Sequence, residues 1–254
     1  MALNYLRGLA ISVVLIGLAS LLGQSAQAQD KKPVLTMFGS EIPGYMMDSI
    51  TRPGILIELV RKVSAESGYQ INYRLVPWPR AMKEASASPN AVIPGLSRLP
   101  NREANYTWIE PIIGAKSAFV SLGKKINSFA EGRELSAVGA WRGTSHEQEL
   151  KENNIENILS FNNVKKSIKM IEMGRVKAWY GDVNEILTRW NENAVDKSLR
   201  LKFGKVLKVE HIWLAGGKGM PKKVAKDLRL ALKKVIKSGF RDEMSLKYFN
   251  YVVK

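Results

Sequence analysis

The chain has 254 residues, of which 39 are lysine or arginine and 23 are aspartate or glutamate, so its formal net charge is +16. It contains no cysteine and only two histidines, which excludes disulfides, thiolate metal sites and a cysteine nucleophile and disfavours a metal site built from histidines. The excess positive charge is compatible with nucleic acid, a membrane surface or an acidic ligand as partner.

The amino terminus has the parts of a secretory signal peptide. Arg7 supplies the positive charge, an apolar run covers residues 8–23, and a small-x-small sequence ends at Ala28. The apolar run is short for a membrane span, so cleavage after Ala28 is favoured over a membrane anchor. Residues 1–28 are therefore predicted to be a signal peptide. An exported protein does not normally meet chromosomal DNA, so no nucleic-acid partner is expected.

Strand and helix patterns alternate along the mature chain. Hydrophobic alternation and β-branched residues predict strands at residues 34–38, 69–76, 91–93, 116–122, 136–141, 178–180 and 206–215. Helical spacing and end signals predict helices at residues 55–67, 78–87, 145–153, 164–173, 183–191, 221–237 and 240–249. This alternation is typical of an α/β fold with mainly parallel sheets. Ligands of such sheets bind beyond the carboxyl ends of the strands, which points to the loops after Phe38, Ile93, Trp141 and Tyr180.

Three of these loops carry residues suited to an α-amino acid. One holds Arg102, whose guanidinium can bind a carboxylate through two hydrogen bonds. Another leads through Thr144 and Ser145 into a helix, whose free N–H groups attract an anion. A third holds Asp182, which offers a carboxylate to an ammonium group. Thr144, Ser145 and Asp182 could each be only a helix N-cap, and Arg102 alone could be a surface residue, but together they fit a zwitterion.

Several segments, in this order, resemble the periplasmic solute-binding proteins of polar amino-acid ABC transporters, the bacterial extracellular solute-binding protein family 3. The matching segments lie at residues 53–59, 91–97, 102–103, 138–145, 173–182 and 247–249. The resemblance implies a type II periplasmic-binding-protein clamp, in which each lobe is a mainly parallel sheet flanked by helices and two strands form the hinge. It implies that lobe 1 comprises residues 29–114 plus 208–254 and that lobe 2 comprises residues 115–207.

The resemblance also implies roles for single residues. Ser97 and Arg102 match the positions that hold the α-carboxylate of the ligand. Thr144 or Ser145 matches the carboxylate contact from the second lobe. Asp182 matches the acid that holds the α-ammonium.

The chain departs from the family beside the carboxylate loop. Family members often carry small hydroxyl residues where this chain has Pro94 and Gly95, so Gly95 is expected to bind through its backbone alone. The segment 78–80 resembles a less characterised branch whose members often lack an identified transporter.

Further arginines flank the predicted cleft. Arg80, Arg98 and Arg142 would add to the charge of Arg102 and favour an anionic ligand. All of them except Arg102 could equally be solvated.

Aromatic residues also flank the predicted cleft. Tyr45, Trp78 and Trp141 could stack on a ligand, because tyrosine and tryptophan suit the wet edges of binding clefts. Trp179 lies within a predicted strand and is expected to belong to the core.

The segment from Lys222 to Lys237 holds seven basic residues and one acidic residue. On a helical wheel one arc carries Val224, Leu228, Ala231, Leu232 and Val235. The opposite arc carries Lys222, Lys226, Arg229, Lys233 and Lys237. This profile is typical of a helix that packs on a sheet with a solvated back, so most of the net charge is expected to say little about the ligand. It could aid docking at an acidic partner or an anionic membrane.

Sequence patterns of enzymes are incomplete in this chain. Ser121 and Lys124 match S-x-x-K without its companion motifs, and His146–Glu147 is not followed by the second histidine of a zinc helix. No catalytic residue, metal or cofactor is therefore expected.

The expected function is that of a monomeric periplasmic binding protein. It would capture a small amino acid or related carboxylate and deliver it to a membrane permease. Two alternatives stay open: a ligand-binding sensor subunit for a membrane receptor, and a dehydratase-like enzyme on the same fold, for which Glu41 or Glu103 would have to act.

Overall fold

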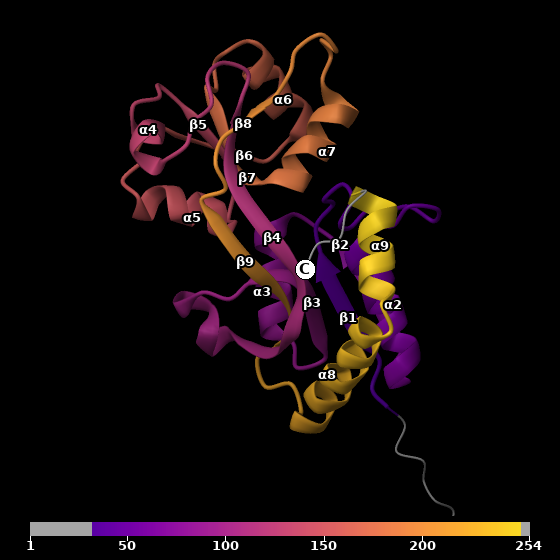
Figure 1. Cartoon of the computed structure of the whole chain (residues 1–254). Helices are drawn as coiled ribbons and strands as arrows, with labels where there is room; N and C mark the ends of the chain where they lie inside the picture. Colours follow the sequence, from indigo (N-terminus) through magenta and orange to yellow (C-terminus); the bar gives the residue numbers. More distant parts are fainter. Residues whose placement is uncertain (1–31, 250–254) are drawn as a thin grey trace, which may run out of the picture. The chain divides into compact units, whose positions relative to one another are not determined.

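Residues 32–249 are described by a computed structural model, in which the residues from Pro33 onward form one unit (Figure 1). The predicted signal peptide and its cleavage site after Ala28 lie outside the described residues. None of the helices within residues 32–249 has the length and apolar character needed to cross a membrane.

The strands are β1 (Leu35–Gly39), β2 (Ile71–Leu75), β3 (Ala91–Ser97), β4 (Tyr106–Ser121), β5 (Val138–Trp141), β6 (Ile158–Phe161), β7 (Ala178–Asp182), β8 (Lys202–Phe203) and β9 (Lys208–Gly217). The helices are α2 (Ile55–Ser67), α3 (Trp78–Ala87), α4 (Phe129–Arg133), α5 (Ser145–Glu152), α6 (Val164–Glu172), α7 (Val183–Asn193), α8 (Lys222–Lys237) and α9 (Phe240–Phe249), with a 3-10 helix, η1, at Pro100–Asn105. Every predicted strand and helix is present. The sequence reading missed β6, β8, α4 and η1, and it placed the start of β4 ten residues too late.

Strand β4 shows why its first part escaped prediction. Pro111 lies within the strand and lacks the N–H group that a sheet requires. The pairing of β4 with β9 shifts register between Trp108 and Glu110 and again between Pro111 and Ile113. These irregularities accommodate the proline, so the strand continues through a residue that normally ends one.

The sheet order is β2-β1-β3-β9-β4-β7-β5-β6, and β8 pairs with β4. Strand β1 pairs in parallel with β2 and β3, and β5 pairs in parallel with β6 and β7. Between these two parallel groups run β4 and β9, which pair with each other in antiparallel orientation from Tyr106↔Gly217 to Ser117↔Lys208. Figure 1 shows these two long strands crossing from one group to the other, which confirms a two-lobed α/β fold with two hinge strands.

Separate hydrophobic cores lie on the two sides of the crossing strands. The first lobe packs Leu35, Ile93 and Leu228 into one cluster. The second lobe contains two clusters, one around Trp179 and one around Tyr180. The exact lobe boundaries at residues 114–115 and 207–208 stay a prediction.

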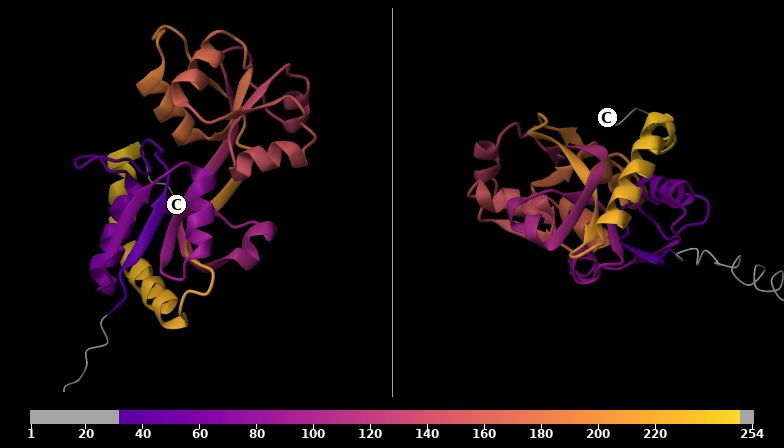
Figure 2. Two further views of the ribbon diagram at one scale, coloured as in Figure 1. Left: turned by 180° about the vertical axis from the view of Figure 1, so that it is seen from behind. Right: turned by 90° about the horizontal axis from the view of Figure 1, so that it is seen from below.

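Helices cover both faces of the first lobe's sheet. Helices α2, α8 and α9 pack together on one face, and α3 contacts β1, β3 and β9 from the other, as the views in Figure 2 show. Helix α8 buries the arc that the helical wheel predicted, namely Val224, Leu228, Ala231, Leu232 and Val235. Its basic arc is not wholly solvated, because Arg229 donates to the carbonyls of Ile109 and Trp108 and Lys233 pairs with Glu110 at 3.6 Å.

Candidate functional site

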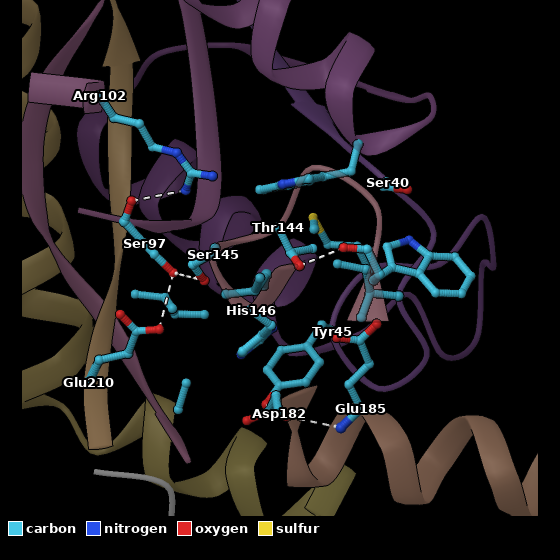
Figure 3. A pocket seen from close by; sticks show the side chains of 18 residues that line it. Ser40, Tyr45, Ser97, Arg102, Thr144, Ser145, His146, Asp182, Glu185 and Glu210 are labelled. Atoms are coloured by element: carbon cyan, nitrogen blue, oxygen red, sulfur yellow. Dashed lines mark hydrogen bonds between the residues drawn. The ribbon is translucent and has the colours of Figure 1, made fainter. Parts of the chain in front are cut away.

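A pocket of about 70 Å³ lies where the two lobes face each other, at the carboxyl ends of β1, β3, β5 and β7 (Figure 3). Of the eleven residues predicted for the site, nine line it: Tyr45, Trp78, Gly95, Ser97, Arg102, Trp141, Thr144, Ser145 and Asp182. The loops that the strand-end rule selected therefore contribute residues to one pocket.

Arg102 provides the pocket's basic group. It lies on η1, and its guanidinium donates to the carbonyl of Ser97 at 3.1 Å and to that of Gly143, across the cleft, at 3.4 Å. Burial lowers the pKa of Arg102 from its usual value, but an arginine stays charged. Within residues 32–249 no carboxylate lies within ion-pair distance of this guanidinium, although the charge of Glu210 partly opposes the lowering of its pKa. A bound anion can therefore pair with it directly.

Asp182 is both a helix cap and a pocket residue, so the two interpretations of it hold together. Its Oδ1 accepts from the backbone N–H of Glu185 at 2.9 Å, which caps α7, and from the hydroxyl of Tyr45 at 2.8 Å. Its Oδ2 accepts from the backbone N–H of Lys116 at 3.3 Å. Burial raises the pKa of Asp182 to about 6, against the opposing effect of these hydrogen bonds. An ammonium group placed beside this carboxylate would reverse the shift.

Tyr45 is positioned by the start of α2. The first N–H groups of that helix need acceptors, and Ile55 and Leu56 donate to the carbonyls of Gly44 and Tyr45, both at 2.9 Å. Gly54, with φ +98°, allows this approach, because a Cβ there would lie 2.4 Å from the carbonyl of Tyr45. The phenol is thereby fixed facing Asp182.

The start of α5 closes the pocket from the second lobe. Thr144 is the N-cap that the sequence offered as an alternative, since its Oγ1 accepts from the N–H of Glu147 at 3.4 Å. Ser145 is buried, and its hydroxyl lies 3.0 Å from that of Ser97 in the first lobe. The pocket thus receives one hydroxyl from each lobe on the side where Arg102 also stands (Figure 3).

Hydrogen bonds connect the lobes directly across the cleft. Besides the contacts from Tyr45 to Asp182, from Ser97 to Ser145 and from Arg102 to Gly143, the guanidinium of Arg189 donates to the carbonyl of Glu41 at 3.1 Å. The conformation described is therefore a closed one, in which the pocket is bounded by both lobes.

Sequence reasoning missed two carboxylates and a histidine of the pocket. Glu185 follows Asp182 by three residues, the spacing of a capping box, which is a signal that was available. Glu210 lies on β9, and no local motif marks it. His146 shares a hydrogen bond of 2.9 Å with the hydroxyl of Ser117, and burial lowers its pKa to about 4, so it is neutral at physiological pH.

Both of the additional carboxylates are paired with bases. Glu185 Oε1 lies 2.8 Å from Nε of Arg189. Glu210 lies 3.5 Å from Nζ of Lys208 and also accepts from the hydroxyl of Ser97 at 3.2 Å. Glu185 has Arg189 to itself, whereas Glu210 shares Lys208 with Glu149, which lies 3.7 Å from the same Nζ.

The flanking arginines do not reach the pocket. Arg80 is exposed and pairs with Glu84 on its own helix. Arg142 is exposed, and Arg98 pairs with Glu103 while its guanidinium lies over the ring of Trp213 at 4.8 Å. None of the three lines the cavity. The sequence therefore predicted more positive charge at the site than the pocket has.

The three aromatic residues predicted for the site all line the pocket. Tyr45 and Trp78 are buried in the wall of the pocket, and Trp141 is half-buried there. Trp179 belongs to the core, as expected, and stacks against Trp141 with ring centroids 6.4 Å apart.

No protein-family model matches the chain, and no curated protein matches it in sequence. Solved structures do match it. A histidine kinase sensor domain with similarity to periplasmic binding proteins has a TM-score of 0.79 at 14% identity, over 89% of this chain and 100% of that one. An ancestral arginine-binding protein bound to glutamine has a TM-score of 0.73 at 20% identity, over 85% and 97%. The arginine-, lysine-, histidine-binding protein ArtJ of Geobacillus stearothermophilus has a TM-score of 0.73 at 16% identity, over 87% and 96%.

These matches define the class of the fold. The chain has the two-lobed type II fold of periplasmic amino-acid-binding proteins, so the resemblance predicted from its segments is confirmed for the fold. The same fold serves transport proteins and a kinase sensor domain among these neighbours, so the function has to be argued from the pocket.

Proposed function

We propose that this protein is a binding protein, not an enzyme, and that it holds an α-amino acid in zwitterionic form between its lobes. The charge balance of the pocket carries this proposal. Within the described part of the chain, Arg102 and Asp182 are the charged pocket residues that lack an ion-pair partner, whereas Glu185 and Glu210 each pair with a base. One uncompensated positive group and one uncompensated negative group match the carboxylate and the ammonium of an amino acid.

In this proposal each predicted site residue that lines the pocket has a definite role. The ligand carboxylate binds the guanidinium of Arg102 and the hydroxyls of Ser97 and Ser145, and the ligand ammonium binds Asp182. The hydroxyl of Tyr45 holds Asp182 in place. The remaining predicted contacts that line the pocket form its walls, and these are Trp78, Gly95, Trp141 and Thr144.

Such a ligand would favour the closed conformation. Arg102 comes from the first lobe and Asp182 from the second, so a ligand that binds both is held fully only when the lobes meet. A ligand shifts a conformational equilibrium by its difference in affinity for the two states. Closure about β4 and β9 then makes the bound state recognisable to a partner.

The partner we propose is a membrane permease, with the protein working in the periplasm after removal of its signal peptide. Neighbours that are named as amino-acid-binding proteins or as an amino-acid transporter support this role. A second candidate is a sensor, because a histidine kinase sensor domain is among the matching structures. Deletion of the gene separates the two: a transport role predicts loss of uptake of the labelled ligand, and a sensor role predicts intact uptake with loss of the transcriptional response.

A thermal-shift screen of amino acids tests the binding proposal. A ligand at 100-fold its Kd adds about 2.7 kcal/mol to the free energy of unfolding. Arg102→Ala and Asp182→Asn are expected to lower the shift produced by the best amino acid by about half or more. Arg175→Ala, at an exposed position outside the pocket, is the control and should keep it. An amino acid that stabilises both pocket variants as well as the unaltered protein would contradict the proposal.

A further inference from the structure

Building on the proposed function, we propose that the side chain of the bound amino acid is small and uncharged, and that Arg189 sets this selectivity by neutralising Glu185. The zwitterion argument concerns the carboxylate and the ammonium of the ligand, whereas the size of the pocket and the buried position of Arg189 bear on the ligand's side chain.

The size of the pocket limits the ligand. A volume of about 70 Å³ is about half that of a cavity of roughly 150 Å³, which is enough to hold benzene. Alanine has as many non-hydrogen atoms as benzene and serine has one more, whereas glutamate, lysine and arginine are much larger, so the smallest amino acids demand the least additional opening. A larger side chain would require the lobes to separate.

Separation of the lobes would break the contacts that close the cleft. The hydrogen bonds from Tyr45 to Asp182 and between the hydroxyls of Ser97 and Ser145 join opposite lobes at 2.8 and 3.0 Å. The hydrogen bond from Arg189 to the carbonyl of Glu41 does the same. A ligand that fits within the closed pocket keeps these bonds, so small amino acids are favoured over large ones.

The charge of the pocket wall limits the ligand further. Glu185 lines the pocket and would attract a cationic side chain if it were free. One turn further along α7, Arg189 pairs with it at 2.8 Å, and the side chain of Arg189 is only 3% exposed. The guanidinium also lies 4.2 Å from the ring centroid of Trp141, another wall residue. These contacts and the carbonyl of Glu41 hold Arg189 behind Glu185, so the carboxylate has no uncompensated charge to offer.

The other wall carboxylate is held in a similar way. The two oxygens of Glu210 face Lys208 at 3.5 Å and the hydroxyl of Ser97 at 3.2 Å. Lys208 also pairs with Glu149 at 3.7 Å, but among the described pocket residues a cationic ligand side chain finds no acid other than Asp182 that lacks an ion-pair partner. An anionic side chain would meet Asp182, Glu185 and Glu210 with no base except the one that its α-carboxylate needs. A neutral side chain avoids the cost of burying a charge without a partner of opposite sign.

Calorimetric titration of the whole mature protein tests the claim. L-alanine and L-serine are expected to bind at least tenfold more tightly than L-lysine, L-arginine and L-glutamate. In Arg189→Gln the charge of Glu185 is released, and the affinity for lysine relative to alanine should rise at least tenfold. The double variant Glu185→Gln, Arg189→Gln should return this ratio to that of the unaltered protein. A purely structural role of Arg189 would lower all affinities together and leave the ratio unchanged.

Two results would overturn the inference: a charged amino acid that binds the unaltered protein as tightly as alanine, or a lysine-to-alanine ratio that Arg189→Gln does not change. If Arg189→Gln does not fold, Glu185→Gln is the alternative variant, because it removes the acidic partner of Arg189. It must raise the affinity for glutamate relative to alanine. An unchanged glutamate-to-alanine ratio in that variant also overturns the inference. Failure of the proposed function looks different, because then no amino acid binds at all or Arg102→Ala leaves binding intact.

Discussion

Ligand affinity should fall when the pH is lowered through about 6, because Asp182 has to be ionised to hold an ammonium group. Burial raises the pKa of this carboxyl to about 6 in the free protein, and the hydrogen bonds from Tyr45 and from the backbone of Glu185 oppose the shift only in part. An α-ammonium stays charged throughout the range in which Asp182 titrates. The affinity should therefore follow the ionised fraction of Asp182.

The size of the effect follows from that pKa. With a value of about 6, roughly nine-tenths of the carboxyl is ionised at pH 7 and roughly one-tenth at pH 5, so the affinity should drop about tenfold between these two conditions. His146 does not interfere, since burial lowers its pKa to about 4 and keeps it neutral over the whole interval.

Isothermal titration calorimetry between pH 5 and pH 8 measures the dependence. Below pH 6, titrations in two buffers with different ionisation enthalpies should also detect a proton released on binding. In Asp182→Asn the affinity should be low and independent of pH. A constant affinity from pH 8 to pH 5 in the unaltered protein would refute the assignment of Asp182 to the ammonium.

Two further predictions concern stability and the flanking arginines. The pKa of Asp182 is about 6 in the folded protein, above its usual value of 3.8, so the folded state binds more protons than the unfolded state. The free energy of unfolding therefore falls as the pH rises between about 4 and 6, by at most about 3 kcal/mol. Asp182→Asn should therefore raise the Tm of the ligand-free protein more at pH 7 than at pH 4; an equal or opposite change at the two pH values would contradict this. Arg80→Ala and Arg142→Ala should each change ligand affinity less than about threefold, because both side chains are exposed and do not line the pocket; a loss of tenfold or more in titration would show that one of them reaches the ligand.

Most of the fold could be predicted because its elements carry local signals. Helix α8 combines an apolar arc with a basic arc, and α2 ends at Gly68, which has the left-handed conformation that glycine adopts readily at helix ends. Besides the short elements β6, β8, α4 and η1, the start of β4 was missed, because Pro111 argues locally against a strand and only the pairing with β9 overrides that preference.

The site could be predicted in part, for a different reason. Strand ends place loops together, so Ser97, Arg102 and Asp182 could be assigned to one cleft from topology. The direction in which a side chain points is set by its neighbours, and Arg80 turns to Glu84 on α3 instead of the cleft. Glu210 was missed because it reaches the pocket only through the pairing of distant strands. Pairing of charges in three dimensions, which sequence does not show, therefore decides the electrostatics of the pocket.

The most direct test of the zwitterion site is a calorimetric cycle that removes the ligand's charge and the protein's charge in turn. L-alanine and L-alaninamide, which has a neutral amide in place of the carboxylate, are titrated into the unaltered protein and into Arg102→Ala. Loss of a charge-assisted hydrogen bond costs about 1.5–3 kcal/mol, so Arg102→Ala should weaken alanine binding by roughly 10- to 150-fold. It should leave the weak binding of alaninamide nearly unchanged, because the amide has no carboxylate to lose. An equal loss for both ligands would show that Arg102 does not hold the carboxylate.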